Sequence, residues 1–94
     1  MPVLKKTVTL VHQQGLHARP AALFVQVAKR YASRITVKKG RKCVDGKSIM
    51  GLLTLTAQQG ARISITVDGP DASDAIERLV ALVTEPLPEK SVEQ

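Results

Sequence analysis

The sequence predicts a single α+β domain, a four-stranded antiparallel sheet with three helices on one face. Each expected strand alternates apolar and polar residues, which is typical of a sheet with one buried and one solvated face. Segments with helical apolar stripes alternate with these strands in the order β-α-β-β-α-β-α. The length of 94 residues fits one domain with one modest core.

The first expected strand covers residues 4–11, and its apolar residues fall mainly on one side, which Lys6 interrupts. A polar, glycine-containing connection follows over 12–17. Pro20 should then open a helix at its first position, because the N–H that proline lacks would have no partner there.

The first expected helix, residues 21–31, carries two apolar stripes at helical spacing. The stripes consist of Phe24, Ala28 and Tyr31 on one side, and Leu23 and Val27 on the other. One stripe is enough to dock a helix on a sheet. The other is a candidate partner surface, and the sequence leaves open which stripe faces the core.

Three more strands are expected where apolar and polar residues alternate, over 34–38, 42–44 and 62–67. Ser48 should cap a short helix that runs to Leu55, because a serine oxygen accepts an N–H at a helix start. The last helix follows Gly69-Pro70-Asp71 and ends before Pro86, since the residue before a proline disfavours helical geometry.

The composition favours a cytoplasmic protein. The net charge is +6, but the basic residues are scattered and only two aromatic residues are available for base stacking, so no nucleic-acid partner is expected. Cys43 is the single cysteine, which suits a reducing compartment. Neither a membrane-spanning stretch nor a signal-peptide core is found, so no membrane insertion is expected. We expect a domain over 1–86 and a disordered polar tail over 87–94.

The stretch Gly15-Leu16-His17-Ala18-Arg19-Pro20 is the most informative part of the sequence. The start of a helix presents unpaired N–H groups and a partial positive charge, so it favours an anion. Arg19 would add a guanidinium beside His17. The same field disfavours the imidazolium form and leaves a neutral ring nitrogen free to act as a nucleophile. These residues predict a site where His17 accepts a phosphoryl group.

Simpler interpretations stand beside this one. A single histidine in a polar loop is commonly a solvated residue or a helix cap. Gly46-Lys47-Ser48 ends like a phosphate-binding loop, but position 41 holds arginine where that motif needs glycine. The histidines and Cys43 are too far apart in the sequence to suggest a metal site.

Two motifs in this chain resemble signatures of the HPr phosphocarriers. The stretch from Gly15 to Ala21 is similar to the active-site signature of that family, and the stretch from Gly46 to Leu52 is similar to its second signature. They lie about 30 residues apart, as in the family, and the resemblance covers roughly residues 3–84. It implies the family's open-faced β-sandwich and a phosphocarrier, with no cofactor and no catalytic activity of its own.

The resemblance also implies a route for the phosphoryl group. His17 would accept it on Nδ1 from Enzyme I, which is charged by phosphoenolpyruvate, and would pass it to EIIA proteins or domains for sugar uptake. Arg19 would stabilise the phosphate. The family further implies a monomer.

Ser48 matches the serine that a dedicated kinase phosphorylates in some family members. A phosphoserine adds roughly −1.5 to −2 charges, which should slow transfer at His17. A kinase or phosphorylase acting on Ser48 and a transcriptional regulator are therefore candidate partners. Helix capping alone would also explain this serine.

The family positions that dock partners correspond to six residues of this chain. They are Ala18, Pro20, Leu23, Ile49, Met50 and Leu53. The side chain of methionine adapts to different surfaces, which favours docking for Met50. The apolar residues of the short helix could equally be core residues, as is expected of Leu52 and Leu55.

Three other functions remain open from the sequence. The chain could be a regulatory phosphocarrier of a nitrogen-type phosphotransferase system. It could be a docking module for transcriptional regulators, although such family members replace the histidine that this chain keeps at His17. It could also be a small basic nucleic-acid binder. The sugar and the EIIA partner are not specified by the sequence.

Overall fold

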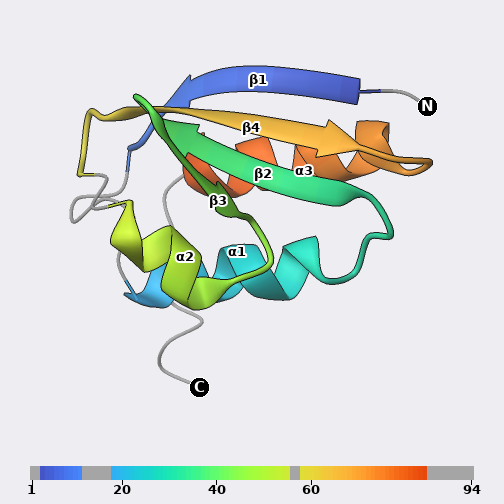
Figure 1. Cartoon of the computed structure of the whole chain (residues 1–94), viewed down its shortest axis with the longest axis horizontal. Coiled ribbons are helices and arrows are strands. Elements are labelled where there is room, and N and C mark those ends of the chain that lie inside the picture. The colour runs from blue at the N-terminus through green and yellow to red at the C-terminus, as the bar shows by residue number, and fades with distance from the viewer. Residues whose placement is uncertain (1–2, 12–17, 56–57, 85–94) are drawn as a thin grey trace.

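The structure is a computed structural model that describes residues 3–11, 18–55 and 58–84. These residues form four strands and three helices in the order β-α-β-β-α-β-α (Figure 1), which confirms the predicted fold class. The tail predicted at 87–94 lies outside the described residues, so the proposed domain limits stay a prediction.

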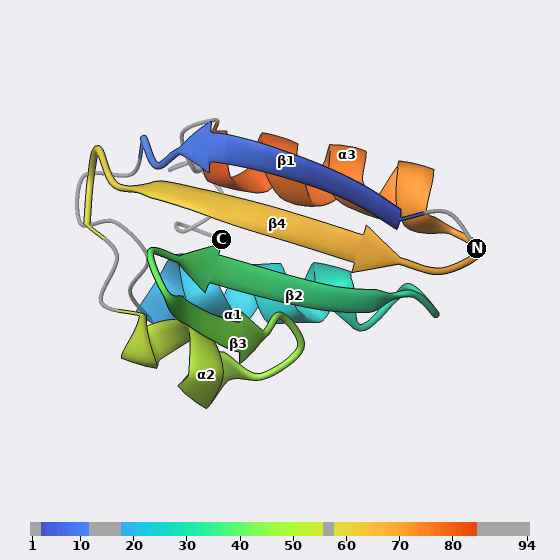
Figure 2. The same ribbon diagram turned by 45° about the horizontal axis from the view of Figure 1, so that its top comes forward.

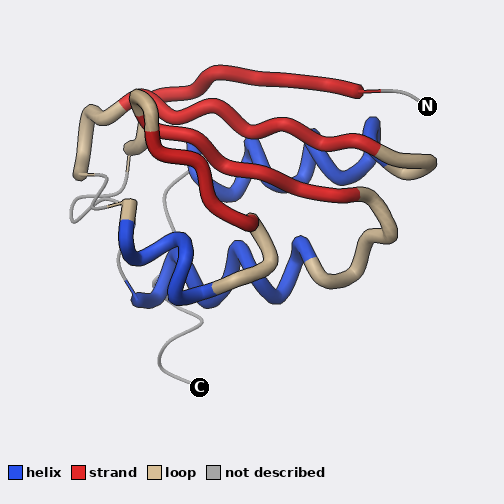
Figure 3. Tube along the Cα trace, viewed as in Figure 1, coloured by secondary structure: helices blue, strands red, loops and turns tan. Residues whose placement is uncertain are grey.

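The four strands form one antiparallel sheet with the spatial order β1-β4-β2-β3 (Figure 3). The strands are β1 (Val3–Thr9), β2 (Arg34–Lys39), β3 (Lys42–Asp45) and β4 (Arg62–Asp68). β4 lies between β1 and β2, and its Ile63, Ile65 and Val67 are buried on the side that faces the helices. Alternation along β4 and β2 therefore encodes one buried and one solvated face.

Three helices cover one face of this sheet and leave the other face open (Figure 2). They are α1 (Ala18–Ala28), α2 (Ile49–Thr54) and α3 (Ala72–Thr84). α3 packs against β1 and β4, while α1 packs between α3 and α2. This arrangement places the starts of α1 and α3 at opposite ends of the molecule (Figure 1).

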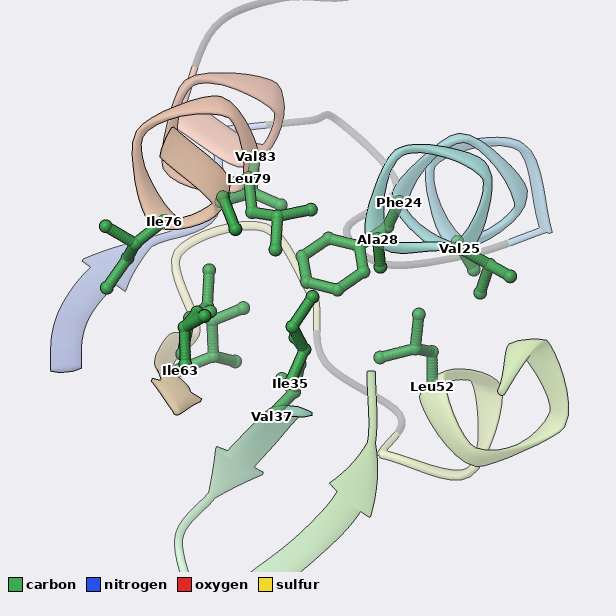
Figure 4. Packing of buried hydrophobic residues seen from close by; sticks show 14 of the residues in the cluster. Phe24, Val25, Ala28, Ile35, Val37, Leu52, Ile63, Ile76, Leu79 and Val83 are labelled. Atoms are coloured by element: carbon green, nitrogen blue, oxygen red, sulfur yellow. The ribbon is translucent and has the colours of Figure 1, made fainter. Parts of the chain in front are cut away.

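The core is almost entirely aliphatic, with Phe24 as its one aromatic ring. In Figure 4 this ring lies between α1, α3 and the sheet, near Ile35 and Leu79. Leu52 and Leu55 are buried, as predicted. Truncating a buried phenylalanine typically costs about 3–5 kcal/mol, so Phe24 fixes the position of α1 on the sheet.

The predicted limits of the first strand were wrong by one or two residues. β1 begins at Val3, opposite Asp68, and ends at Thr9. Beyond it the Val11 amide donates to the carbonyl of Val83, 3.5 Å away, at the end of α3. The chain therefore leaves the sheet before residue 11, although Leu10 stays buried.

The predicted start of the first helix was also wrong. α1 begins at Ala18, so Pro20 is its third residue and not its first. The first four N–H groups of a helix have no intrahelical partner, and proline is tolerated throughout the first turn. The helix ends at Ala28, after which the Tyr31 amide donates to the Ala28 carbonyl in a tighter turn (3.2 Å).

The structure decides between the two apolar stripes of α1. Phe24 and Ala28 are buried, whereas Leu23 and Val27 are only partly buried. None of the helices that the structure describes is both long and apolar enough to cross a membrane. The cytoplasmic location stays a prediction.

Candidate functional site

The N-terminal end of α1 is buried on one side and exposed on the other. Pro20 and Ala21 are buried in the first turn, and Phe24 and Val25 follow one turn later. Arg19 lies between these positions on the helix surface and is exposed. The first turn contains no acidic residue. The helix start therefore presents a partial positive charge and an exposed guanidinium to solvent, and its first turn holds no carboxylate that would neutralise them.

His17 lies outside the described residues, and α1 begins at the residue bonded to it. The carbonyl of a residue that precedes a helix accepts the first intrahelical bond, and that residue borders the unpaired amides. The sequence position of His17 is thus at the end of α1 that favours an anion. Its role as the phosphoryl acceptor stays a prediction at this point.

The second motif forms the N-terminal end of α2, and Ser48 is its N-cap. The Ser48 backbone is extended, with φ −118° and ψ 115°, and its Oγ accepts a hydrogen bond from the Gly51 amide at 3.1 Å. The Leu52 amide donates to the Ser48 carbonyl at 3.0 Å. The capping role predicted for Ser48 is confirmed, and its part in regulation is a separate question.

The loop before Ser48 is anchored more firmly than its sequence suggested. A Cβ at Gly46 would lie 2.5 Å from Cγ2 of Ile35, so only glycine fits against β2 at this position. The Gly46 amide donates to the Ile35 carbonyl at 2.8 Å. This bond occupies the Gly46 amide, which is therefore not available to a phosphate.

Lysine side chains fix both ends of α2, a role that the sequence analysis missed. Lys47 Nζ donates to the Tyr31 carbonyl at 2.8 Å, just after α1. Lys42 Nζ, from β3, donates to the Thr54 carbonyl at 3.0 Å, at the C-terminal end of α2. Both bonds join residues more than ten positions apart, and no local pattern in the sequence signals them.

The residues proposed as a docking patch differ in exposure. Met50 is 69% exposed and Ile49 is 38% exposed on α2. Leu53 is partly buried and packs against the core, and Leu23 on the neighbouring α1 is partly buried. Pro20 is buried, so it offers little side-chain area to a partner. The exposed apolar surface of this patch is therefore concentrated at the first turn of α2.

At the opposite end of the molecule, the pKa of the Asp71 carboxyl is lowered. Asp71, just before α3, accepts hydrogen bonds from the amides of Ala32 (2.8 Å) and Ser33 (3.0 Å), and from the Ser33 hydroxyl. The Ser33 hydroxyl and the Ala32 amide are the main reasons why the pKa of Asp71 lies below its ordinary value. This site links α3 to the loop before β2, far from α1's first turn.

Comparison with a family model decides the assignment. Residues 4–85 match the model described as the PTS HPr component phosphorylation site. The chain belongs to the HPr family.

Known HPr-family proteins match most of this chain. The phosphocarrier protein HPr of Haemophilus influenzae is 46% identical over 83% of this chain and 92% of its own length. The HPr-like protein Crh of Halalkalibacterium halodurans is 43% identical over 86% of this chain and 96% of its own length. The crystal structure of HPr from Bacillus anthracis superposes with a TM-score of 0.84, at 45% identity, covering 87% of this chain and 98% of that one.

Membership of the HPr family makes the protein a phosphocarrier of the phosphotransferase system and not a catalyst. The residues that the structure describes contain no group of three or more acidic, histidine or cysteine side chains placed to hold a metal ion. Within these residues, the two family signatures are exposed to solvent at the first turn of α1 and at the first turn of α2.

Proposed function

We propose that His17 accepts a phosphoryl group from phosphohistidine on Enzyme I and passes it to a histidine of an EIIA protein or domain. In the first step the neutral Nδ1 of His17 attacks phosphorus. The new N–P bond forms while the donor's N–P bond breaks, and the bonding electron pair returns to the donor imidazole. The second step repeats this exchange with the EIIA histidine as the nucleophile.

The observation that carries the proposal is the start of α1. The helix begins directly after His17, its first turn holds no acidic residue, and the Arg19 side chain is exposed there. A phosphoryl group on His17 would bring negative charge to this helix end, where dipole and guanidinium both favour it. The family match includes position 17, which supports the same assignment.

The experiment is phosphorylation of the full chain with phosphoenolpyruvate and Enzyme I, followed by intact mass measurement. We expect one added phosphoryl group that mild acid removes, because a phosphoramidate is acid-labile. His17→Ala should accept none while keeping the circular dichroism spectrum of the parent chain. An unchanged adduct in His17→Ala would show that another residue is the acceptor.

His12 offers the matched control. It is the other histidine of the chain, five positions before His17. His12→Ala should accept the phosphoryl group as the parent does. If His12→Ala loses the adduct and His17→Ala keeps it, the acceptor is His12 and the role of the α1 start must be reassigned.

We further propose that phosphorylation of Ser48 regulates this transfer. Ser48 is partly buried, and its Oγ already lies at the start of α2, within 3.1 Å of the Gly51 amide. A phosphate there would face the same helix terminus, which would hold its charge. It would also place about two negative charges beside exposed Ile49 and Met50, the surface proposed to dock Enzyme I, EIIA and a regulator.

A regulatory role is the second candidate function, and the likeness to Crh favours it. In that case the first turn of α2 would dock a transcriptional regulator when Ser48 is phosphorylated. The presence of His17 still favours the relay. Incubation with each EIIA of the source organism separates the two functions, because a purely regulatory protein would transfer its phosphoryl group to none of them. The monomeric state stays a prediction.

A further inference from the structure

One end of this protein carries a group of cationic side chains, and the described carboxylates lie away from it. The end of β2, the turn and the start of β3 carry four cationic side chains in five residues, which we call the basic hairpin: Lys38, Lys39, Gly40, Arg41 and Lys42. Gly40 adopts a φ of +59°, which tightens the turn. Lys38, Arg41 and Lys42 are exposed, and Lys39 is partly buried.

The basic hairpin lies at the same end of the molecule as the start of α1. The end of β2 pairs with the start of β4, where Lys38 faces Ser64. The end of β1 also pairs with the start of β4, where Thr9 faces Arg62. Figures 1 and 2 both show the hairpin, the end of α2 and the start of α1 at this end. Lys42 also joins the hairpin to α2 through the Thr54 carbonyl. Arg19 and Arg62 add two further exposed cations.

The carboxylates of the described residues lie elsewhere. Asp68 faces Val3 and Arg34 at the opposite end of the sheet. Asp45 closes β3 at the end away from the hairpin turn. The remaining described acidic residues are Asp71, Asp74 and Glu77, just before α3 and in its first two turns. Within the described part of the chain, the strands therefore carry cationic and no acidic residues at the end of the molecule where α1 begins.

We propose that the basic hairpin is part of the surface that docks an acidic protein partner during phosphoryl transfer. This inference rests on the proposed function of His17 and extends its interface beyond the docking patch on α2. The molecule measures 40 × 31 × 20 Å, so the end across its long axis is comparable in area with a standard interface of roughly 800 Å² per partner. A partner that covers this whole end would contact both the start of α1 and the hairpin.

A protein fits this surface better than a nucleic acid or a membrane. The hairpin offers no aromatic side chain for base stacking, and no apolar residue stands among its four cations. Its charge lies at the same end of the molecule as the proposed transfer site, where complementary charge on a partner would speed encounter. Because such attraction is screened within about 10 Å at 0.1 M salt, only cations near the interface should matter at that ionic strength.

The test compares two triple variants with the same net charge. The hairpin variant carries Lys38→Gln, Lys39→Gln and Arg41→Gln, and it keeps Gly40 for the turn and Lys42 for its bond to α2. The control variant carries Lys29→Gln, Arg30→Gln and Arg78→Gln, all exposed residues outside the hairpin. The rate of phosphoryl acceptance from Enzyme I is measured for each at about 0.1 M salt.

We expect the hairpin variant to lower kcat/KM for this phosphocarrier as substrate by roughly 10-fold, through KM, while the control stays within about twofold. The difference should shrink at high salt. A double variant, Lys38→Gln with Arg41→Gln, changes only exposed residues and should show an intermediate effect if the triple variant unfolds. Equal rates for the hairpin and control variants would overturn the inference.

The outcomes separate the inference from the function on which it rests. If the parent chain accepts no phosphoryl group, the proposed function fails. If the parent chain does accept one and the hairpin and control variants behave alike, only the docking role of the hairpin fails. Binding of duplex DNA or anionic vesicles that is lost in the hairpin variant, with transfer unchanged, would assign the hairpin to that polyanion instead.

Discussion

The starts of α1 and α3 differ in whether acidic residues of the fold neutralise the positive end of the helix dipole. α3 is preceded by Asp71 and has Asp74 in its first turn, so its own carboxylates complement the helix dipole. α1 has no acid in its first turn and carries Arg19 there instead. The positive end of the α3 dipole is neutralised within the fold, whereas the positive end of the α1 dipole faces solvent.

The difference shows how one small domain separates stability from function. At α3 the carboxylate of Asp71 is used to hold the loop before β2, through the amides of Ala32 and Ser33. The described first turn of α1 holds no acidic residue to supply the corresponding stabilisation, which is typically worth about 0.3–1 kcal/mol. The proposed phosphoryl group would supply that missing negative charge.

Placing an acidic residue in the first turn of α1 would remove this difference between the two helices. Arg19→Glu should lower phosphoryl acceptance by roughly 100-fold, because it removes the proposed phosphate ligand and repels the incoming charge. The same change should raise the free energy of unfolding by about 0.3–1 kcal/mol, since the new carboxylate complements the helix dipole. Rates with Enzyme I and thermal unfolding measure the two effects.

Arg30→Glu is the matched control for Arg19→Glu, since it makes the same charge change beyond the other end of α1. It should leave acceptance within about twofold at about 0.1 M salt. Loss of acceptance in both variants would show that net charge, and not the start of α1, controls the rate.

Removing the acid at α3 should affect stability and not transfer. Asp71→Ala leaves the Ala32 and Ser33 amides without their carboxylate partner, so the midpoint of thermal unfolding should fall. Acceptance at His17 should be unchanged in the folded variant. Asp74→Ala removes a carboxylate from the same helix end and should lower the midpoint less, because no hydrogen bond joins the Asp74 side chain to that loop.

The stabilisation by Asp71 should depend on pH in a definite direction. The folded state lowers the pKa of Asp71 below the ordinary value of 3.8, so its stabilisation is complete above that value and is lost as pH falls through the lower folded pKa. Unfolding midpoints of the parent chain and Asp71→Asn should therefore converge in strong acid. A constant difference at all pH values would contradict the charge-based explanation.

Substitutions at the start of α2 should have the smallest effects on stability and on phosphoryl transfer. Ser48→Ala should cost about 1 kcal/mol because the Gly51 amide loses its acceptor. Ser48→Asn and Ser48→Asp should both keep the cap, but only Ser48→Asp adds charge. Slower acceptance from Enzyme I in Ser48→Asp than in Ser48→Asn would isolate the effect of charge, and equal rates would argue against regulation at this serine.

Periodicity and capping chemistry were enough to predict the element order and much of the core. Alternation predicted β2, β3 and β4, and apolar stripes at helical spacing predicted helices between and after the strands. The cap at Ser48 was predictable because capping involves residues only three apart. These features are local, so a single sequence contains the information that fixes them.

Features that join distant parts of the chain were not predictable. The bonds of Asp71 to Ala32 and Ser33 span 38 or 39 positions, and Lys47 reaches a carbonyl 16 positions away. The start of α1 was misplaced because proline fits any position in a first turn. The assignments of His17 and Arg19 came from a motif and its charge pattern, and both stay predictions.

The strand order β1-β4-β2-β3 has a consequence for how the protein is made. β4 is the last strand in the chain, yet it supplies the pairing edge for both β1 and β2. A nascent chain that ends before residue 62 holds β1 without its neighbour, because closing this pair means joining segments about 60 residues apart. The four-stranded sheet can therefore form only after the chain as far as Asp68 has left the ribosome, and shorter fragments would expose apolar strand faces to aggregation and proteolysis.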